Sequence, residues 1–205
     1  MKEATSLGRA VEPFHRGIVM VSGAPGAGKT TLARPLARAL GMPLFAKDSI
    51  KERIHDVLAG AGTDDAGDEP RDRLGLAAEP PWSRRLGAAS MELLWLLAAD
   101  APACVLEANF WYGHEHQNAS LRALTDGGRL VEVHCTVPRE EAIRRYAARH
   151  AAGERHAVHT DATLTPERWE QHFSAPIGVG QVIEVDTSGP VDVAALAVSV
   201  RALLG

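Results

Sequence analysis

The sequence lacks the features that mark exported, membrane-spanning or nucleic-acid-binding proteins. Its 205 residues contain no apolar run of about 18 residues, so we expect no membrane-spanning helix and no membrane partner. Residues 1–16 have no apolar core of signal-peptide length, which predicts a flexible leader on a cytoplasmic protein. With 22 basic and 26 acidic residues the net charge is -4, which argues against a dedicated nucleic-acid-binding protein but does not exclude a local basic patch.

Cysteine is also scarce, and its positions predict no chemistry. Cys104 and Cys135 each lie in an apolar run that we interpret as a buried strand. Neither belongs to a redox motif or to a set of residues with metal-ligand spacing. We therefore expect two small core residues without a disulfide, as is usual in a reducing compartment.

Apolar, strand-like runs alternate with helical patterns over residues 17–205. This alternation predicts a single α/β domain built on a parallel sheet with right-handed crossovers. Residues 59–82 are rich in Gly, Asp and Pro, which predicts a mobile loop inside a larger insertion, residues 59–97. The expected strands are 18–21, 42–46, 103–109, 130–137 and 181–187, and the expected helices are 29–40, 49–58, 84–97, 114–124, 138–150, 165–173 and 191–204.

A glycine-rich loop lies between the first expected strand and the first expected helix. Its sequence, GAPGAGKTT, matches G-x-x-x-x-G-K-[ST] in full. Small residues leave the backbone N–H groups free to surround phosphate oxygens, and the helix N-terminus adds partial positive charge. We expect Lys29 to contact the β- and γ-phosphates and to be surface-accessible without nucleotide, and the Thr30 hydroxyl to ligate Mg²⁺. The predicted nucleotide-binding residues are Gly23, Ala24, Pro25, Gly26, Ala27, Gly28, Lys29, Thr30 and Thr31.

The rest of the sequence does not support a GTPase. No Asn-Lys-x-Asp stretch, which would read guanine, occurs in the chain. Asp-x-x-Gly occurs at 64–67, 72–75 and 186–189, but the first two follow no strand and the third is too late in the chain. We interpret all three as chance matches. The remaining question is which acidic residue completes the nucleotide-binding site.

Acidic residues follow several expected strands at their carboxyl ends, where ligands bind in open α/β sheets. Asp48 follows the second strand and Glu107 lies near the end of the third. Phosphoryl transfer to a hydroxyl often uses a carboxylate that takes the proton, and Asp48 is our first choice. The alternative is that Asp48 only caps the helix beginning near Ser49. Glu107 could orient a Mg²⁺ water or hold the substrate, or form a structural ion pair with Lys47 or an arginine.

The expected helix after the fourth strand is rich in arginine. Arg145 and Arg149 are four residues apart and share a helix face, and Arg155 follows shortly after. We predict that residues 138–160 form a lid that brings these three arginines onto the transferring phosphate. The alternative is a solvated cationic face.

Aromatic residues make up only 5% of the sequence, so a group of three stands out. Phe110, Trp111 and Tyr112 follow Asn109 directly, and Trp82 closes the 59–82 loop. We predict that Asn109, Phe110, Trp111 and Trp82 help to form the wall of an acceptor pocket. Core packing of the same loop is the open alternative.

The histidines do not predict a metal site. His114 and His116 are too close in sequence to share one helix face. His150, His156 and His159 lie in the predicted lid, and we interpret them as surface or substrate contacts rather than as zinc ligands.

Four stretches together resemble a known group of enzymes. GAPGAGKTT, KDSIKE, VLEANF and VPREEAIRRYAARH with GERHAVH resemble the small P-loop kinases of the antibiotic-phosphotransferase type. That group includes chloramphenicol phosphotransferase, the zeta-toxin sugar-nucleotide kinases and the kinase domain of polynucleotide kinases. The resemblance covers about residues 18–204 and implies a five-stranded sheet in the order 2-3-1-4-5, flanked by helices, with an arginine-bearing lid after the fourth strand.

The resemblance also implies roles for individual residues. Lys29 and Thr30 would act on phosphate and Mg²⁺, and Asp48 would activate the acceptor. The lid arginines would contact the phosphates, and adenine would stack near Thr187 and Ser188, where the last strand ends.

The expected function is therefore that of an ATP-dependent phosphotransferase, with ATP and Mg²⁺ as its cofactors. Its acceptor would be a hydroxyl of a small molecule, such as an antibiotic or a sugar-like or nucleoside-like metabolite. The alternatives are a polynucleotide or nucleotide kinase and a non-catalytic, regulatory ATP-binding module. The insertion of residues 59–97 is expected on the acceptor side, but it matches no acceptor pattern, and the sequence specifies no oligomeric state.

Overall fold

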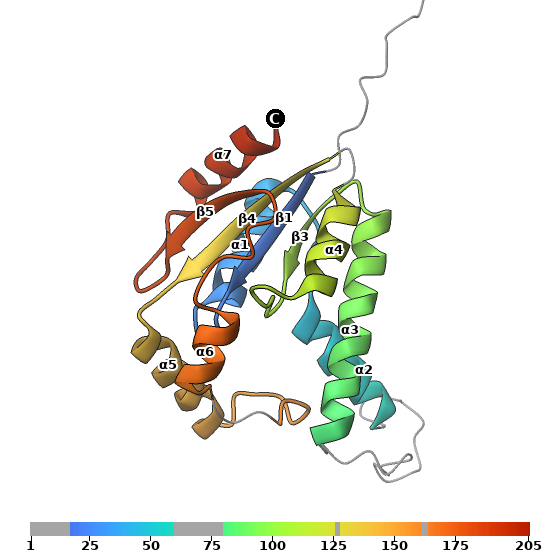
Figure 1. The fold of residues 1–205 in the computed structure, drawn as a ribbon, viewed down its shortest axis with the longest axis vertical. Helices are drawn as coiled ribbons and strands as arrows, with labels where there is room; N and C mark the ends of the chain where they lie inside the picture. Colours follow the sequence, from blue (N-terminus) through green and yellow to red (C-terminus); the bar gives the residue numbers. More distant parts are fainter. Residues whose placement is uncertain (1–16, 60–79, 126–127, 161–163) are drawn as a thin grey trace, which may run out of the picture.

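A five-stranded parallel sheet forms the centre of the molecule in a computed structural model that describes residues 17–59, 80–125, 128–160 and 164–205 (Figure 1). The order β2-β3-β1-β4-β5 is the order that the resemblance implies. β1 is buried along its whole length because strands and helices cover it on every side. The strands are β1 (Gly17–Gly23), β2 (Leu44–Ala46), β3 (Ala103–Glu107), β4 (Arg129–Thr136) and β5 (Gln181–Asp186).

Helices cover both faces of the sheet (Figure 1). α1 and α7 bury their apolar sides against one face, where Val19 and Val21 of β1 point. α3 and α4 pack on the other face, over Ile18 and Met20. No helix within the described ranges is both long enough and apolar enough to cross a membrane. The helices are α1 (Lys29–Leu40), α2 (Lys47–Leu58), α3 (Pro80–Asp100), α4 (Glu115–Leu124), α5 (Arg139–Ala151), α6 (Pro166–His172) and α7 (Val193–Leu204).

The start of α2 differs from the sequence prediction. The helix begins at Lys47 instead of Ser49, and the residue at its cap position is Ala46, whose backbone is extended and whose side chain makes no cap. Asp48 therefore lies inside the first turn and is not the N-cap that the alternative interpretation required. An acid in this turn still gains from the partial positive charge of the helix N-terminus.

The segment predicted to be a mobile loop is largely outside the described residues. Residues 60–79 are not described, and residues 80–82 belong to the first turn of α3. α3 begins four residues earlier than predicted and ends at Asp100, three residues later than predicted.

The two cysteines are separated as expected. Cys104 pairs in register with Ile18, and Cys135 pairs with Gly23, so β1 lies between them and five residues of its length separate the two partners. Cys104 packs with the α3 and α4 side of the sheet, whereas Cys135 packs with the α1 and α7 side. Both are buried and no disulfide joins them, which confirms the prediction.

A buried carboxylate fastens a connecting segment to the sheet. Glu132 of β4 is 0% exposed and accepts a hydrogen bond from the Ser22 hydroxyl at 2.5 Å. It also accepts hydrogen bonds from the backbone N–H groups of Ile177 and Gly178, each at 2.9 Å, and Nδ1 of His134 lies 3.7 Å from its Oε1. Burial alone would raise the pKa of Glu132, but these donors together hold that pKa below its usual value. The segment before β5 is therefore bound to an ionised carboxylate that also accepts a hydrogen bond from β1, the strand that leads into the glycine loop.

Candidate active site

The glycine loop between β1 and α1 is shaped by close packing on both sides. Gly26 has a φ of +89°, and a Cβ there would collide with the backbone of Ala142 in α5. Gly23 has a φ of +125°, and a Cβ there would meet the backbone of Cys135 in β4. A larger residue at either position would be strained and also lacks space. The loop is therefore held closely against β4 and α5.

Lys29 is buried, and the prediction that it is surface-accessible without nucleotide is wrong. Its side chain is 6% exposed, and Nζ donates a hydrogen bond to the Ala24 carbonyl at 2.8 Å. The loop folds back over the lysine, so a backbone carbonyl takes the place of water. Burial lowers the pKa of Lys29, while the nearby carboxylates of Glu107 and Asp48 oppose that effect.

A cavity of 210 Å³ lies over the glycine loop, and we name it the loop cavity. Lys29 and Thr30 line it from the start of α1, and Glu107 lines it from the end of β3. Two of the predicted lid arginines, Arg149 and Arg155, also line it. It brings together backbone amides, cations and carboxylates from four separate parts of the chain.

The side-chain oxygens of Thr30 and Glu107 lie close together in this cavity. The Thr30 hydroxyl donates a hydrogen bond to Oε1 of Glu107 at 3.2 Å. Burial raises the pKa of Glu107, and the charge of Lys29 opposes this rise. Hydroxyl and carboxylate oxygens are the ligands that Mg²⁺ prefers. The residues present therefore fit a magnesium ion at this position, which would supply a charge for binding phosphates.

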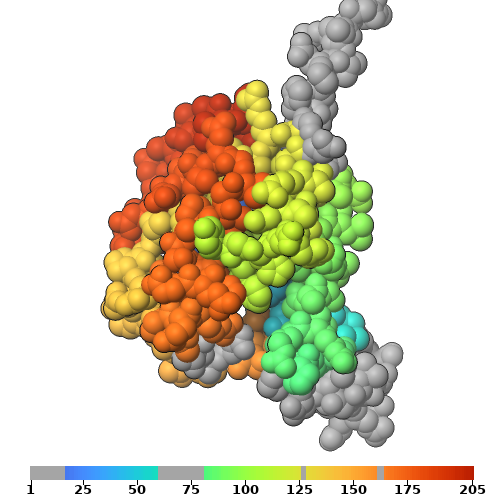
Figure 2. All heavy atoms as spheres, viewed as in Figure 1, coloured from blue at the N-terminus to red at the C-terminus, as the bar shows by residue number. Residues whose placement is uncertain are grey.

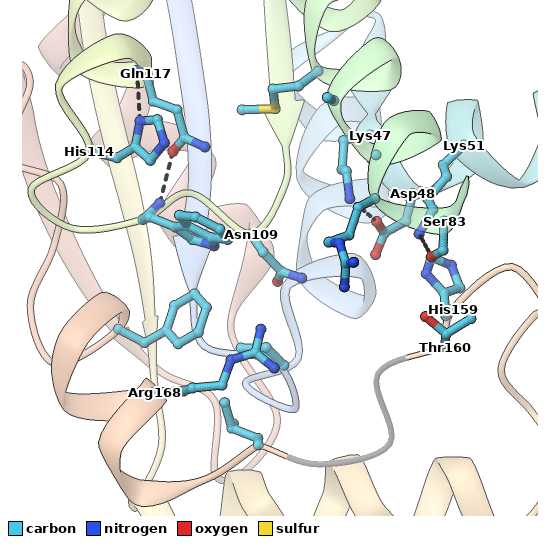
Figure 3. A pocket seen from close by; sticks show the side chains of 18 of the residues that line it. Lys47, Asp48, Lys51, Ser83, Asn109, His114, Gln117, His159, Thr160 and Arg168 are labelled. Carbon is cyan, nitrogen blue, oxygen red and sulfur yellow. Dashed lines mark hydrogen bonds and ion pairs between the residues drawn. The ribbon is translucent and has the colours of Figure 1, made fainter. Parts of the chain in front are cut away.

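A second cavity, of 410 Å³, adjoins the first and is named here the side cavity. It is lined by α2, α3, α6, the residues after β3 and the segment after α5 (Figure 3). Figure 2 shows the surface hollowed between α3 and α6, which both line this cavity. The residues that line both cavities are Pro25, Asp48, Asn109, Tyr146, Arg155 and His159.

Asp48 lies where the two cavities meet. Its Oδ1 is 3.1 Å from Nζ of Lys47. Burial is the largest single influence and would raise its pKa, but the charge and hydrogen bond of Lys47, together with His159 and Lys29, hold the pKa of Asp48 below its usual value. Asp48 is therefore ionised at neutral pH and able to accept a hydrogen bond or a proton from a hydroxyl group in the side cavity.

The aromatic residues after β3 separate into different environments. Trp111 lines the side cavity and stacks on His172 of α6, with ring centroids 4.6 Å apart. Phe110 does not line the cavity, because its side chain turns into the core beneath α3 and packs against Trp95. The expected wall contact of Phe110 is therefore wrong, and core packing explains that residue. Trp82 belongs to the first turn of α3 and lines neither cavity.

Arg145 also lies away from both cavities. Its guanidinium donates hydrogen bonds to the carbonyls of Thr187 and Ser188, each at 3.1 Å, and to Glu141 at 2.6 Å. The hydrogen bonds to these two carbonyls fix the position of Arg145 and join α5 to the end of β5. The hydroxyl of Thr187 in turn donates a hydrogen bond to the carbonyl of Ala27 at 2.8 Å. The end of β5, where the resemblance places adenine, is thus fastened to the glycine loop.

Two histidines of the predicted lid contact α2, which the sequence analysis did not anticipate. His156 lies 2.7 Å from Asp56, and His159 lies 2.8 Å from Glu52. Glu52 and Asp56 are one helical turn apart, so the two pairs lie side by side. They connect the segment after α5 to the helix that carries Asp48.

Several residues of the side cavity were missed by the sequence analysis, namely Lys51, Ser83, Arg84 and Arg168. A signal existed for one of them, because Lys47 and Lys51 are four residues apart and share a face of α2. Ser83 and Arg84 lie in the insertion of residues 59–97 that was expected on the acceptor side, but no pattern singled them out, and no signal existed for Arg168, since only folding brings α3 and α6 to the same cavity.

Solved structures share this architecture. A protein from Chloroflexus aurantiacus that is described as a kinase is 26% identical, with a TM-score of 0.72, and the match covers 93% of this chain and 99% of that one. Shikimate kinase from Acinetobacter baumannii is 15% identical, with a TM-score of 0.52 and 92% of each chain covered. The second likeness shows the fold alone. The architecture is that of P-loop kinases, as the sheet order also shows.

No curated protein matches the chain in sequence. The profile of one protein family does match it, over residues 18–175. That range runs from β1 through α6 and contains the glycine loop and all residues that line the two cavities. Because the match covers well over half of the sequence, the chain belongs to the AAA domain family.

Proposed function

We propose that the protein transfers the γ-phosphate of ATP to a hydroxyl group of a small molecule. One observation carries this proposal: a cavity over the glycine loop adjoins a second cavity, and an ionised carboxylate, Asp48, lines both. A module that only binds ATP needs no second cavity beside the phosphates. At 410 Å³ the side cavity has the size of an ordinary small-molecule site.

The transfer follows from this arrangement. The acceptor oxygen bonds the γ-phosphorus while the bond from that phosphorus to the β–γ bridging oxygen breaks, and ADP keeps the bridging oxygen. The acceptor proton passes to a carboxylate oxygen of Asp48. Lys29 and the amides of the glycine loop hold the phosphates in line, and Arg149 and Arg155 place further positive charge beside them.

The positions of the two carboxylates support different roles for them. Asp48 lines both cavities, whereas Glu107 lines only the loop cavity and accepts the hydrogen bond of Thr30. We therefore assign proton acceptance to Asp48 and the support of Mg²⁺ to Glu107 and Thr30. This assignment replaces the open choice between the two acids that the sequence left.

The test is phosphoryl transfer from labelled ATP to three sets of compounds: hydroxylated metabolites, hydroxylated antibiotics, and an oligonucleotide with a 5′-hydroxyl. Product formation from a small hydroxylated compound supports the proposal, and the same assay with Lys29→Met measures the background. Labelling of the oligonucleotide in preference to all small compounds would show a polynucleotide kinase instead. Tight ATP binding without transfer to any acceptor would favour the regulatory module.

A further inference from the structure

Two histidines and an aspartate meet where the segment after α5, residues 152–160, reaches α2. His55 and Asp56 are neighbours near the C-terminal end of α2, and His156 belongs to the segment after α5. The ring centroids of the two histidines are 5.1 Å apart, with the ring planes at 85°. One side-chain nitrogen or oxygen atom of each of the three residues lies within 4.8 Å of the other two. We name these three residues the His-Asp group.

The hydrogen bonds of the His-Asp group leave one nitrogen without a partner. Nε2 of His156 is 2.7 Å from Oδ1 of Asp56, which is a hydrogen-bond distance. Nδ1 of His55 lies 3.7 Å from the same oxygen, which is too long for a hydrogen bond. This nitrogen is buried and has no hydrogen bond to any residue that the structure describes. Buried polar atoms normally have a partner, so the contact between His156 and Asp56 does not account for the whole group.

The donor atoms of the group are those that bind zinc. Imidazole nitrogen and carboxylate oxygen are ordinary ligands of Zn²⁺, whereas Mg²⁺ and Ca²⁺ take oxygen ligands. Bonds of about 2.0–2.2 Å in a tetrahedral site place the ligand atoms about 3.3–3.6 Å apart. The distances of 2.7 Å and 3.7 Å to Oδ1 of Asp56 lie on either side of that range. Small side-chain rotations therefore give the spacing of a zinc site with three protein ligands, which leaves the fourth position to water.

A neighbouring pair shows the arrangement that needs no metal. His159 and Glu52 come from the same two parts of the chain, and Nε2 of His159 is 2.8 Å from Oε1 of Glu52. Within the described parts of the chain, no third ligand residue completes a cluster with this pair. One imidazole and one carboxylate satisfy each other, so this contact is an ordinary hydrogen bond. The His-Asp group differs from it by the second imidazole.

We propose that His55, Asp56 and His156 bind a Zn²⁺ ion that fastens the segment after α5 to α2. The spacing of histidines along the sequence does not indicate such a site, because Asp56 and His156 are 100 residues apart and only folding brings them together. The proposal replaces the interpretation of His156 as a surface or substrate contact.

The two parts of the chain that the ion joins both contribute to the cavities. The segment after α5 carries Arg155 and His159, and α2 carries Asp48, and all three residues line both the loop cavity and the side cavity. A bound ion would therefore fix two walls of the candidate active site relative to each other. The zinc site itself does not depend on the proposed transfer reaction, and its test needs neither nucleotide nor acceptor.

The test is a titration of the full chain with Zn²⁺, after metal has been removed with EDTA and the chelator washed away. Calorimetry should show one saturable Zn²⁺ per chain, which EDTA releases and excess Mg²⁺ does not displace. Zinc-edge X-ray absorption of the complex should show two imidazole ligands, with Zn–N distances of about 2.0–2.1 Å. At about 100 times its dissociation constant, Zn²⁺ should raise the melting temperature by about 5–10 °C.

Variants locate the ion. Loss of a residue that merely supports a metal ligand costs about 10–100-fold in affinity, so Asp56→Asn and His156→Gln should each weaken zinc binding by about 100-fold or more. Both side chains are partly exposed, at 33% and 27%, so the fold should tolerate these changes, and melting without Zn²⁺ checks this. His55→Gln tests the nitrogen that lacks a hydrogen bond. The matched control is His150→Gln, an exposed histidine of α5 outside the group, which should bind zinc like the wild type.

Three results would overturn the inference. One is the absence of saturable zinc binding. Another is zinc binding that Asp56→Asn and His156→Gln leave unchanged, or that His150→Gln weakens as much as they do. The third is binding that survives in these variants but is lost in Glu107→Gln, which would place the ion in the loop cavity. All three leave the proposed phosphotransferase standing, because that function is measured separately, by transfer from ATP.

Discussion

The loop cavity and the side cavity are built in different ways. The loop cavity is built around one continuous segment, residues 25–31, and we propose that the backbone N–H groups of this segment bind the phosphates, while side chains from three other parts of the chain complete the lining. The side cavity is assembled from side chains of α2, α3, α6 and two connecting segments that are far apart in the sequence. A backbone site of this kind tolerates little variation, because glycines such as Gly26 have no room for a Cβ. A side-chain site can change its ligand through single substitutions without disturbing the strand and helix that flank the glycine loop.

The largest effect is expected at the loop cavity, from Lys29→Met. Met keeps most of the volume of the buried side chain but removes the charged donor. Loss of a neutral donor to a transition state costs about 10²–10³-fold, and a charged donor is worth roughly twice as much in free energy, so transfer should fall by about 10⁴-fold or more. The measurement is the rate of phosphoryl transfer at saturating acceptor.

Thermal melting without nucleotide provides the control for Lys29→Met. The variant loses the hydrogen bond to Ala24 but no longer buries a cation whose pKa is lowered by burial. These effects oppose each other, so the melting temperature should stay within about 4 °C, which corresponds to about 1 kcal/mol at this size. Near-normal transfer in a folded variant would remove the loop cavity from the reaction.

The junction of the two cavities is tested by Asp48→Asn. If Asp48 takes the acceptor proton, the rate of transfer should fall by about 10²–10⁴-fold while ATP binding changes little. The lowered pKa of Asp48 places its acid-dependent loss of activity below the ordinary value of 3.8, so the wild type should keep this step active at any pH above about 4. Pre-steady-state transfer rates and calorimetry with an ATP analogue separate the two quantities. A normal transfer rate in the Asn variant would assign the proton to another group.

Arg149 and Arg145 form a matched pair one helical turn apart. Arg149 lines the loop cavity, whereas Arg145 is bound to the carbonyls of Thr187 and Ser188 outside it. We expect Arg149→Ala to slow transfer by about 10²-fold. Arg145→Ala should change the transfer rate by less than about twofold and lower the stability by about 1–2 kcal/mol through the lost hydrogen bonds. Equal losses of rate in the two variants would contradict this division between them.

The smallest effect is expected at the cysteines, which belong to neither cavity. Burial raises the pKa of Cys135 to about 12, so its thiol stays protonated at every pH up to about 10. Iodoacetamide should therefore label neither Cys104 nor Cys135 in the folded protein at pH 8, and should label both in denaturant, as read by mass spectrometry. Rapid labelling of the folded protein at either position would show that the sheet opens there.

The prediction from sequence succeeded where the signal was local. The glycine loop, the positions of the strands and the separation of Cys104 from Cys135 follow from short patterns or from the sheet order of the resembling kinases. The end of a strand marks the ligand edge of a parallel sheet, and Asp48 does line both cavities at that edge, while its role as the proton acceptor stays a prediction. The glycine loop and the strands depend on neighbouring residues, which the sequence displays directly, whereas the separation of the cysteines depends on the sheet order that the resemblance implies.

The prediction failed where a side chain has a choice of partners in space. Lys29 was expected to be exposed, but the folded loop supplies the Ala24 carbonyl in place of water. Phe110 and Trp111 are adjacent, yet one enters the core and the other lines the side cavity. Residues 59–97 were expected on the acceptor side, but no local pattern indicated that Arg84 of α3 and Arg168 of α6 would line the same cavity.

The buried carboxylate of Glu132 has a consequence for amide hydrogen exchange. Ile177 and Gly178 lie outside every helix and strand, but their N–H groups donate to a carboxylate that is 0% exposed. Their exchange with solvent requires the connecting segment to leave the sheet and strip hydrogen bonds from an ionised group in the protein interior. Such openings approach the free energy of global unfolding. These two loop amides should therefore exchange as slowly as those of β1 and β4, so that on the timescale of hours this connection behaves as part of the sheet.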